Sequence, residues 1–214
     1  MIPLLSIETS GELCSVAILK SENNYFEINL SEKNIHSEKL MSAIDDLTNF
    51  SGLQISDMKA IALSIGPGSF TGLRIGMSTA KGLAFGAGLP IIPVKTYYAH
   101  ALEISQYLPA ETTFVIANNV NTTELFVSKY KTSEKLFDVV EDVKIIKKEE
   151  FENFIDNKSV VYGNYKKEGK FFNSGPTAKF VAMWAYFFGK DLLTYNFDYM
   201  EPDYIKKFIP RKGK

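Results

Sequence analysis

A glycine-rich segment placed between a strand-like run and a helix-like run is the feature that most constrains how this chain can fold. Residues 60–65 are apolar, and the segment Gly66-Pro67-Gly68-Ser69-Phe70-Thr71-Gly72 follows them directly. A helical pattern then continues to about Gly88. A short apolar run ended by glycine and proline predicts a buried strand, and the periodic run after the loop predicts a helix. The order strand, loop, helix is typical of α/β folds.

The remaining patterns predict two units of mixed sheet and helix. In the first unit, residues 4–8, 14–20, 25–30 and 90–94 read as strands, and residues 35–50 and 97–107 as helices. In the second, residues 114–118, 124–130, 136–146 and 160–163 read as strands, and residues 149–155 and 176–189 as helices. We therefore expect a first unit over residues 1–108 and a smaller one over residues 109–214, with the final helix or tail able to return to the first.

The charge and cysteine content limit the partners and the compartment. Lys and Arg number 24 and Asp and Glu 25, so no broad basic field is available to hold nucleic acid. Cys14 is the only cysteine and falls in an apolar alternation, which predicts a buried strand position and fits the reducing cytoplasm. The uncharged stretch 82–94 contains Pro90 and Pro93 and is too short to span a bilayer, so no membrane partner is expected.

Two short polar segments are candidates for binding a nucleotide or another anion. Glu8, Thr9 and Ser10 follow the first strand, and the glycine-rich segment adds Gly68, Ser69 and Thr71 before a helix. The free N–H groups of that helix could hold a phosphate, or Ser69 or Thr71 could simply cap it. The segment is not a Walker loop, because no lysine occurs until Lys81. If a nucleotide binds here, we expect weak binding.

Two helices are candidates for a partner surface. The helix at 35–50 carries an apolar stripe made of Leu40, Met41, Ala43, Ile44 and Leu47. The helix at 71–87 carries small residues four apart, namely Gly72, Gly76, Ala80 and Ala84. Such a row lets a second helix approach closely, either inside the subunit or in a partner. We predict the partner surface here, and the same surface could join two copies of the chain.

The sequence offers little for catalysis. His36 and His100 are the only histidines, so a multi-histidine metal site cannot be built, and no Gly-x-Ser-x-Gly elbow supports a hydrolase. No catalytic or metal-binding residue is therefore assigned. The last residues are basic, and we interpret them as a solvated terminus or as a local contact with nucleic-acid phosphate: Lys206, Lys207, Arg211, Lys212 and Lys214.

Four of these segments resemble one known family. Glu8-Thr9-Ser10 resembles its Ile-Asp-Thr-Ser/Ala opening, and His36-Ser37-Glu38-Lys39-Leu40 its His-Ser/Thr segment. The stretch from Gly66 to Gly76 resembles its Gly-Pro-Gly-Ser-Phe-Thr-Gly-x-Arg-x-Gly signature, and Pro202-Asp203-Tyr204-Ile205-Lys206 its Pro-x-Tyr-Leu-Arg ending. On these motifs the chain is similar to the TsaB (YeaZ) family, which takes part in making threonylcarbamoyladenosine in tRNA.

The resemblance implies a two-lobed actin-like fold of the ASKHA, ribonuclease-H-like type, with a mixed β-sheet and packed helices in each lobe. It further implies a non-catalytic scaffold without a required cofactor, paired with a TsaD-like catalytic subunit, joined by a TsaE-like ATPase, and reaching tRNA through that complex. TsaD-type proteins hold a metal with a His-x-x-x-His pair. Alignment with that pair places Thr96 at the first histidine and leaves His100 alone.

The chain departs from the family pattern at three places. Glu8 replaces an aspartate, Asn119-Val120-Asn121 stands where Asp-Ala-Arg is common, and Gly163-Asn164-Tyr165-Lys166 differs from Gly-x-Gly-Ala. Two rival functions follow from relatives of the fold: a weak nucleotide-binding or sugar-kinase-like ATPase, and, less favoured, a metal-dependent glycoprotease.

Overall fold

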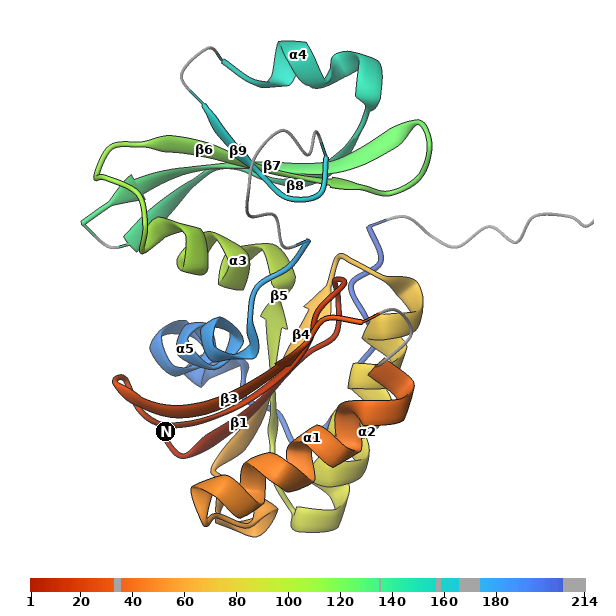
Figure 1. Cartoon of the computed structure of the whole chain (residues 1–214), viewed down its shortest axis with the longest axis vertical. Helices are drawn as coiled ribbons and strands as arrows, with labels where there is room; N and C mark the ends of the chain where they lie inside the picture. Colours follow the sequence, from red (N-terminus) through yellow and green to blue (C-terminus); the bar gives the residue numbers. More distant parts are fainter. Residues whose placement is uncertain (33–35, 135, 157–158, 166–173, 206–214) are drawn as a thin grey trace, which may run out of the picture.

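The computed structural model of the protein describes residues 1–32, 36–134, 136–156, 159–165 and 174–205. Two mixed β-sheets lie one above the other, with a helix between them (Figure 1). The predicted α/β architecture with a mixed sheet in each half is confirmed. Within the described residues, every helix is too short or too polar to cross a membrane.

The first sheet has five strands in the order β3-β2-β1-β4-β5. Its antiparallel part is the predicted meander, and β4 and β5 join β1 in parallel. The strand bounds are β1 Leu4–Glu8, β2 Cys14–Ser21, β3 Asn24–Leu30, β4 Ala60–Gly66 and β5 Ile91–Lys95. Because the parallel strands end at the same edge, the β1–β2 turn and the glycine-rich loop after β4 meet there.

The second sheet has four strands in the order β8-β7-β6-β9. Its strands are β6 Thr113–Asn119, β7 Glu124–Ser133, β8 Leu136–Lys147 and β9 Val160–Tyr162. Strand β9 runs parallel to β6, and the others are antiparallel neighbours. A short 3-10 turn, η2 (Lys148–Glu150), and helix α4 (Phe151–Phe154) cover its outer face, where Phe151 is buried among Val115, Ala117, Leu125 and Val127.

Alternation along β1 sends side chains to two different helical layers. Leu5 and Ile7 point to helices α1 (His36–Ser51) and α2 (Phe70–Ala87), which cover one face. Leu4 packs in the other layer with helices α3 (Thr96–Ser105) and α5 (Ala178–Phe188). Helix α3 also packs on the second sheet, where Tyr97 and Ile104 join Phe114 and Tyr130. One helix therefore serves both hydrophobic cores.

The first turn of α5 is capped by side chains from three other elements. The N–H of Thr177 donates to Glu103 Oε2 at 3.0 Å, that of Ala178 to Ser15 Oγ at 2.8 Å, and that of Lys179 to Glu27 Oε1 at 2.7 Å. These are the N–H groups that a helix cannot satisfy itself. They bring a helix from late in the sequence onto the first sheet.

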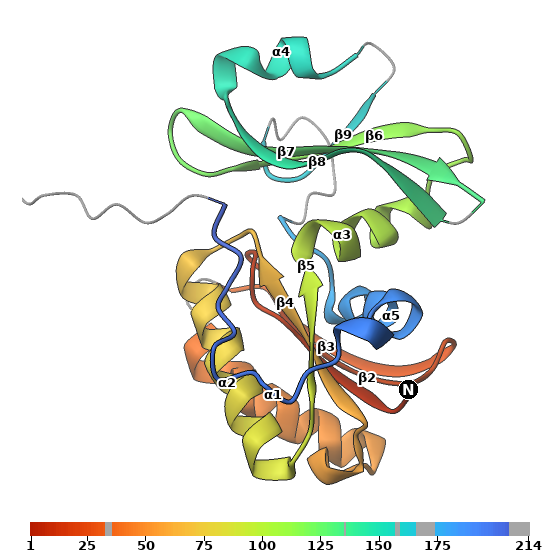
Figure 2. The ribbon, with the colours of Figure 1, turned by 180° about the vertical axis from the view of Figure 1, so that it is seen from behind.

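The chain beyond α5 also returns to the first sheet. After the 3-10 turn η3 (Lys190–Leu192), Thr194 pairs with Ile91 at the edge of β5. The following residues run along α2, where Asp198 O accepts a hydrogen bond from Lys81 Nζ at 2.9 Å (Figure 2). We call residues 194–205 the C-terminal segment. It ends beside the glycine-rich loop, with Asp203 N donating to Ile65 O at 2.7 Å.

Candidate functional site

The glycine-rich loop connects β4 to α2 through a tight turn. Gly66 has a φ of 115°, a backbone conformation that favours glycine. Ser69 is the N-cap of α2, and its hydroxyl accepts a hydrogen bond from Gly72 N at 3.2 Å. The interpretation of Ser69 as a helix cap is therefore confirmed. The side chain of Thr71, two residues further along the chain, is exposed.

The β1–β2 turn lies directly on this loop and on the first turns of α2. Thr9 Oγ1 donates to Gly72 O at 2.8 Å, and Ser69 N donates to Ser10 O at 2.7 Å. A methyl group at Gly68, Gly72 or Gly76 would overlap atoms of Thr9 or Ser10. The glycines are thus needed so that two polar segments, far apart in sequence, can pack against each other.

The structure brings the predicted anion-site residues other than Thr71 together, but it directs many of their polar atoms at one another. Glu8, Thr9 and Ser10 are buried, and their neighbours across the contact are Gly68 and Ser69. The N–H groups of Ser69 and Gly72 are already used in the contacts just described. Nucleotide binding by Glu8, Thr9, Ser10, Gly68, Ser69 and Thr71 stays a prediction.

Glu8 is an acid held inside the protein at the end of β1. Burial raises the pKa of its carboxyl, and hydrogen bonding from Ser10 and Ser64 opposes that rise only in part. Its Oε2 atom has no hydrogen-bond partner among the described residues. A buried carboxyl without a cationic neighbour favours the neutral form, which binds cations poorly.

The two positions that resemble a metal pair differ in their surroundings. Thr96 Oγ1 lies 2.7 Å from Ser64 Oγ and accepts from Gly66 N at 3.1 Å, so it ties α3 to the glycine-rich loop. His100 is buried, and burial lowers its pKa to about 4. The imidazole is therefore neutral near pH 7. Among the described residues, no group of three His, Cys, Asp or Glu side chains is placed to hold a metal ion.

A cavity of about 690 Å³ lies between the two sheets, at the edge where the turn and the loop meet. Its volume falls in the range of small-molecule sites. The first lobe, which contains the five-stranded sheet, supplies the β1–β2 turn, the glycine-rich loop and α3. The second lobe, which contains the four-stranded sheet, supplies the ends of β6 and β7, and the C-terminal segment closes one side. The residues that line it are Ser10, Gly11, Glu12, Pro67, Gly68, Ser69, Phe70, Tyr97, Asn118, Asn119, Val120, Asn121, Phe126, Asn164, Ser174, Asp203, Tyr204 and Ile205.

Two of the departures from the family pattern meet in this wall. Asn119 N donates to Asn164 Oδ1 at 2.7 Å, and Asn119 Nδ2 donates to Asn164 O at 3.0 Å. The changes at the end of β6 and after β9 therefore form one hydrogen-bonded pair. Of the lining residues, Tyr97, Asn118, Phe126 and Ser174 were missed by sequence reasoning, because the contacts that assemble the wall join residues far apart in the chain.

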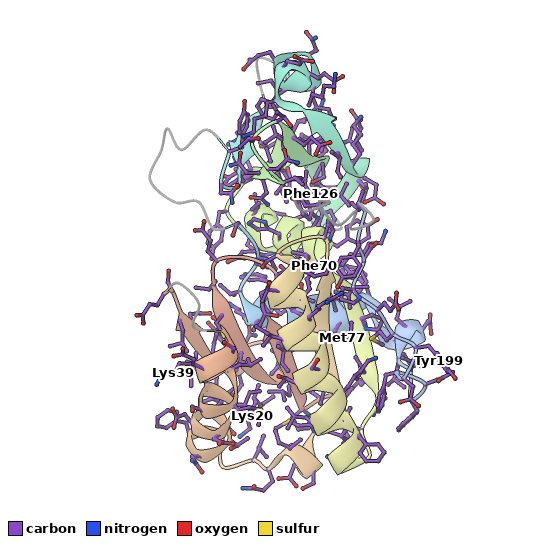
Figure 3. The ribbon with its side chains drawn as sticks, turned by 90° about the vertical axis from the view of Figure 1, so that its right-hand side faces the viewer. Lys20, Lys39, Phe70, Met77, Phe126 and Tyr199 are labelled. Atoms are coloured by element: carbon purple, nitrogen blue, oxygen red, sulfur yellow. The ribbon has the colours of Figure 1, made fainter. Side chains whose placement is uncertain are left out.

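The C-terminal segment supplies an aromatic group at the mouth of the cavity. The Tyr204 ring lies 5.1 Å from the Phe70 ring, and Tyr204 OH accepts from Arg74 Nε at 3.1 Å. The Arg74 guanidinium lies 3.9 Å from the centre of the Phe70 ring. Figure 3 shows Phe70 at the top of α2 and Phe126 above it in the second sheet. The predicted basic residues 206–214 lie outside the described residues.

The predicted partner surface is wrong for most of its residues. Leu40, Ala43, Ile44 and Leu47 are at most 4% exposed and belong to the core between α1 and the first sheet. The row Gly72, Gly76, Ala80 and Ala84 is buried as well. Both helices cover a sheet, so their apolar or small faces turn inward. Of the predicted set only Met41 is exposed, at 47%.

The outer face of α2 carries a second set of small residues. Ser78, Gly82 and Gly86 are exposed and four residues apart, and a Cβ atom at either glycine would touch nothing within 4 Å. Phe85, between them, is 82% exposed. We call these four residues the outer α2 face.

Comparison with known proteins shows which family this chain resembles in sequence. The model of the family described as "TsaD: tRNA N6-adenosine threonylcarbamoyltransferase" matches residues 30–198. A Haemophilus influenzae protein named tRNA threonylcarbamoyladenosine biosynthesis protein TsaB is 39% identical over 127 residues, which is 59% of this chain and 52% of the relative. The Escherichia coli protein of the same name is 42% identical over 95 residues, 44% of this chain and 40% of the relative. The matches thus span about half the length of these relatives or less.

Solved structures share the fold. A Pseudomonas aeruginosa protein described as similar to the peptidase YEAZ superimposes with a TM-score of 0.80 at 23% identity, covering 96% of this chain and 100% of the other. YeaZ from Pseudomonas aeruginosa gives a TM-score of 0.70 at 24% identity, covering 86% and 90%. The two sheets with their shared helix are the two-lobed, actin-like arrangement that was predicted.

Proposed function

This chain belongs to the TsaD family and is similar to its TsaB (YeaZ) members, and from that premise we propose that it is a non-catalytic subunit in the synthesis of threonylcarbamoyladenosine in tRNA. In this proposal a TsaD-like subunit carries out the transfer of the threonylcarbamoyl group to the adenosine next to the anticodon. A TsaE-like ATPase joins the complex, and tRNA is reached through it.

The surroundings of Thr96 and His100 carry the non-catalytic part of the proposal. Thr96 has no imidazole, and its hydroxyl is already engaged by Ser64 and Gly66. His100 is buried and carries the lowered pKa that burial produces. A divalent metal usually takes three or more protein ligands, and one enclosed histidine supplies a single donor.

Activity and metal content test this part directly. The purified chain should show no threonylcarbamoyl transfer to tRNA on its own and should raise the activity of a TsaD-like subunit when the two are mixed. Elemental analysis should find no stoichiometric divalent metal. A bound zinc or iron that is lost in His100→Ala, or transfer by the chain alone, would refute the non-catalytic role.

The outer α2 face supports the pairing part of the proposal. Phe85 is a large exposed apolar side chain, and the small residues beside it allow another helix to approach closely. The same face could join two copies of the chain when the partner is absent. Exposed aromatic side chains of this kind often anchor protein interfaces.

A bulky side chain on this face should block the partner without harming the fold. Gly82→Leu adds volume where no atom lies within 4 Å, so we expect an unchanged circular dichroism spectrum and loss of the complex in size-exclusion chromatography. Asn153→Leu, on the exposed side of α4 in the other lobe, is the matched control. A Gly82→Leu protein that still pairs normally would show that the partner binds elsewhere.

A further inference from the structure

The cavity between the lobes has a chemical character that differs from that of a phosphate site. Among its described lining residues there is no Lys, Arg or His, and two carboxylates, Glu12 and Asp203, lie at its wall. Neither carboxylate forms an ion pair within the described residues. Polyphosphates in proteins are usually held by cationic side chains or by free helix N–H groups, and the described lining residues include no such cation.

The start of α2 does not make up for the missing cations. Ser69 N donates to Ser10 O, Gly72 N to Ser69 Oγ, and Leu73 N to Ser69 O. The N–H groups of Ser69 and Gly72, which could have faced an anion, are therefore already satisfied, and that of Leu73 makes the first regular bond of the helix. Two described cations lie near the wall. The first is Arg74, whose guanidinium is 3.9 Å from the centre of the Phe70 ring and whose Nε donates to Tyr204 OH. The second is Lys95, which has an electrostatic link to Asp203. Burial lowers the pKa of Lys95, but Tyr98, Asp142 and Asp203 raise it on balance, and its Nζ is held 3.3 Å from Asp142 Oδ2.

Aromatic rings and hydrogen-bond acceptors complete the wall. Phe70 and Tyr204 form one ring pair on the first lobe, and Tyr97 and Phe126 form a second pair 6.4 Å apart toward the other lobe. Tyr97 OH accepts a hydrogen bond from Asn118 Nδ2 at 3.0 Å, which leaves its own proton and a lone pair available. Ser10 Oγ is buried at the wall beside the Glu8 carboxyl and makes no hydrogen bond of good geometry among the described residues.

We propose that this cavity binds an organic cation, a guanidinium or ammonium group on a flexible chain, between the ring pair of Tyr97 and Phe126 and the two carboxylates, Glu12 and Asp203. Ring faces attract cations, and a carboxylate forms its strongest hydrogen bonds with charged donors. The cation could come from a free polyamine or from the basic side chain of a polypeptide. The proposal is independent of the pairing proposed above, because it concerns the cavity and not the outer α2 face.

Matched charged and neutral probes test the proposal on the full chain. N-acetyl-arginine methylamide and spermidine are titrated by calorimetry and by amide chemical shifts, beside N-acetyl-citrulline methylamide, which has the shape of the arginine probe without its charge. We expect the arginine probe or spermidine to bind and to shift the signals of Gly11, Asn119 and Asn121, and citrulline to bind at least about tenfold more weakly, the effect of losing one charged hydrogen bond. Whichever cation binds more tightly identifies the source.

Two variants locate the binding. Glu12→Gln and Asp203→Asn remove charge without removing a hydrogen bond seen in the structure, so both should fold and each should weaken cation binding several-fold. Glu22→Gln, in the exposed turn before β3, is the control for a lost negative charge. Equal binding of the citrulline and arginine probes, no binding of either cation, shifts confined to residues outside the cavity, or tighter binding of ATP than of the cations would each overturn the proposal.

Discussion

At the scale of single residues, the glycines of α2 have opposite roles according to the side of the helix on which they lie. Gly76 faces Thr9 so closely that an added methyl group would overlap Thr9 Oγ1, whereas nothing lies within 4 Å of a Cβ at Gly82. Both residues are in the interior of the same helix and six residues apart. Their substitution therefore separates packing from helix propensity.

We expect Gly76→Ala to destabilise the protein by about 2 kcal/mol or more, because the β1–β2 turn must move to admit the methyl group. Gly82→Ala should stabilise it by up to about 1 kcal/mol, since alanine is the better helix former. Urea denaturation of the two variants measures both values. Equal effects of the same sign would show that the turn does not pack on Gly76 as described.

Glu103 is a second residue whose surroundings have a measurable consequence. Its carboxylate caps α5 through Thr177 N, and burial raises its pKa to about 7. A pKa raised in the folded state means that the folded protein holds the proton more tightly than the unfolded chain. The stability associated with this proton is present in full below about pH 4.5 and is lost as the pH rises through about 7.

Glu103→Gln should remove the fall in the free energy of unfolding that this carboxyl causes between about pH 4.5 and pH 7. The amide oxygen still accepts the Thr177 N–H but cannot ionise, so the variant should match the wild type near pH 4.5 and exceed its free energy of unfolding at pH 8 by up to about 3 kcal/mol. Chemical denaturation across this pH range measures the difference. Glu22→Gln controls for the loss of one negative charge, and parallel profiles of Glu103→Gln and the wild type would contradict the assignment.

At the scale of elements, α2 presents two small faces with the same four-residue spacing. The inner row meets the β1–β2 turn, and the outer α2 face is free among the described residues. The first turn is secured by the Ser69 cap, by Thr9 Oγ1 and by the carbonyl of Ser10. The loop and the turn are thus one joint structure, and the start of α2 also forms part of the cavity wall.

Removing the cap should weaken this structure by a modest amount. Ser69→Ala leaves Gly72 N without its acceptor, and we expect a loss of about 1 kcal/mol in the free energy of unfolding. Ser78→Ala, at an exposed position within the same helix, should change stability by less than about 0.5 kcal/mol. Thermal and urea unfolding compare the pair. A neutral Ser69→Ala would mean that solvent or the backbone replaces the cap.

At the scale of the whole molecule, Asn118 connects parts that are distant in sequence. Its Nδ2 donates to Tyr97 OH at 3.0 Å and to Ser174 O at 2.9 Å, and its Oδ1 accepts from Asn164 N at 2.8 Å. It therefore joins α3, the second sheet and the approach to α5. A buried side chain that satisfies three groups is costly to remove, because each group is left without its partner.

Asn118→Ala should lower the free energy of unfolding by about 3 kcal/mol and raise hydrogen exchange in both β6 and the segment before α5. Asn49→Ala, exposed on α1, serves as the control and should change neither quantity. An effect confined to β6 would show that Asn118 supports its own strand only and does not connect the two lobes.

Sequence patterns alone determined the elements and their order. The apolar run of β1, the alternation in β2 and the period of α1 are local properties, and the predicted ranges agree with the observed helices and strands. The buried position of Cys14 and the helix start after the glycine-rich loop also followed from neighbouring residues. Backbone geometry fixes the spacing of side chains along a helix or a strand. Local periodicity in the sequence therefore shows that one face of an element is apolar or carries small residues.

Tertiary structure decided which surface each face meets. The row at Gly72 and Gly76 could have served a partner or the core, and only the position of the β1–β2 turn placed it inside. The cavity wall likewise joins Asn119 with Asn164 and Phe70 with Tyr204, residues 45 and 134 positions apart, by contacts that no local pattern encodes. Such contacts depend on how the two sheets and the C-terminal segment pack, and this packing minimises the exposed apolar surface of the whole chain rather than of any one element.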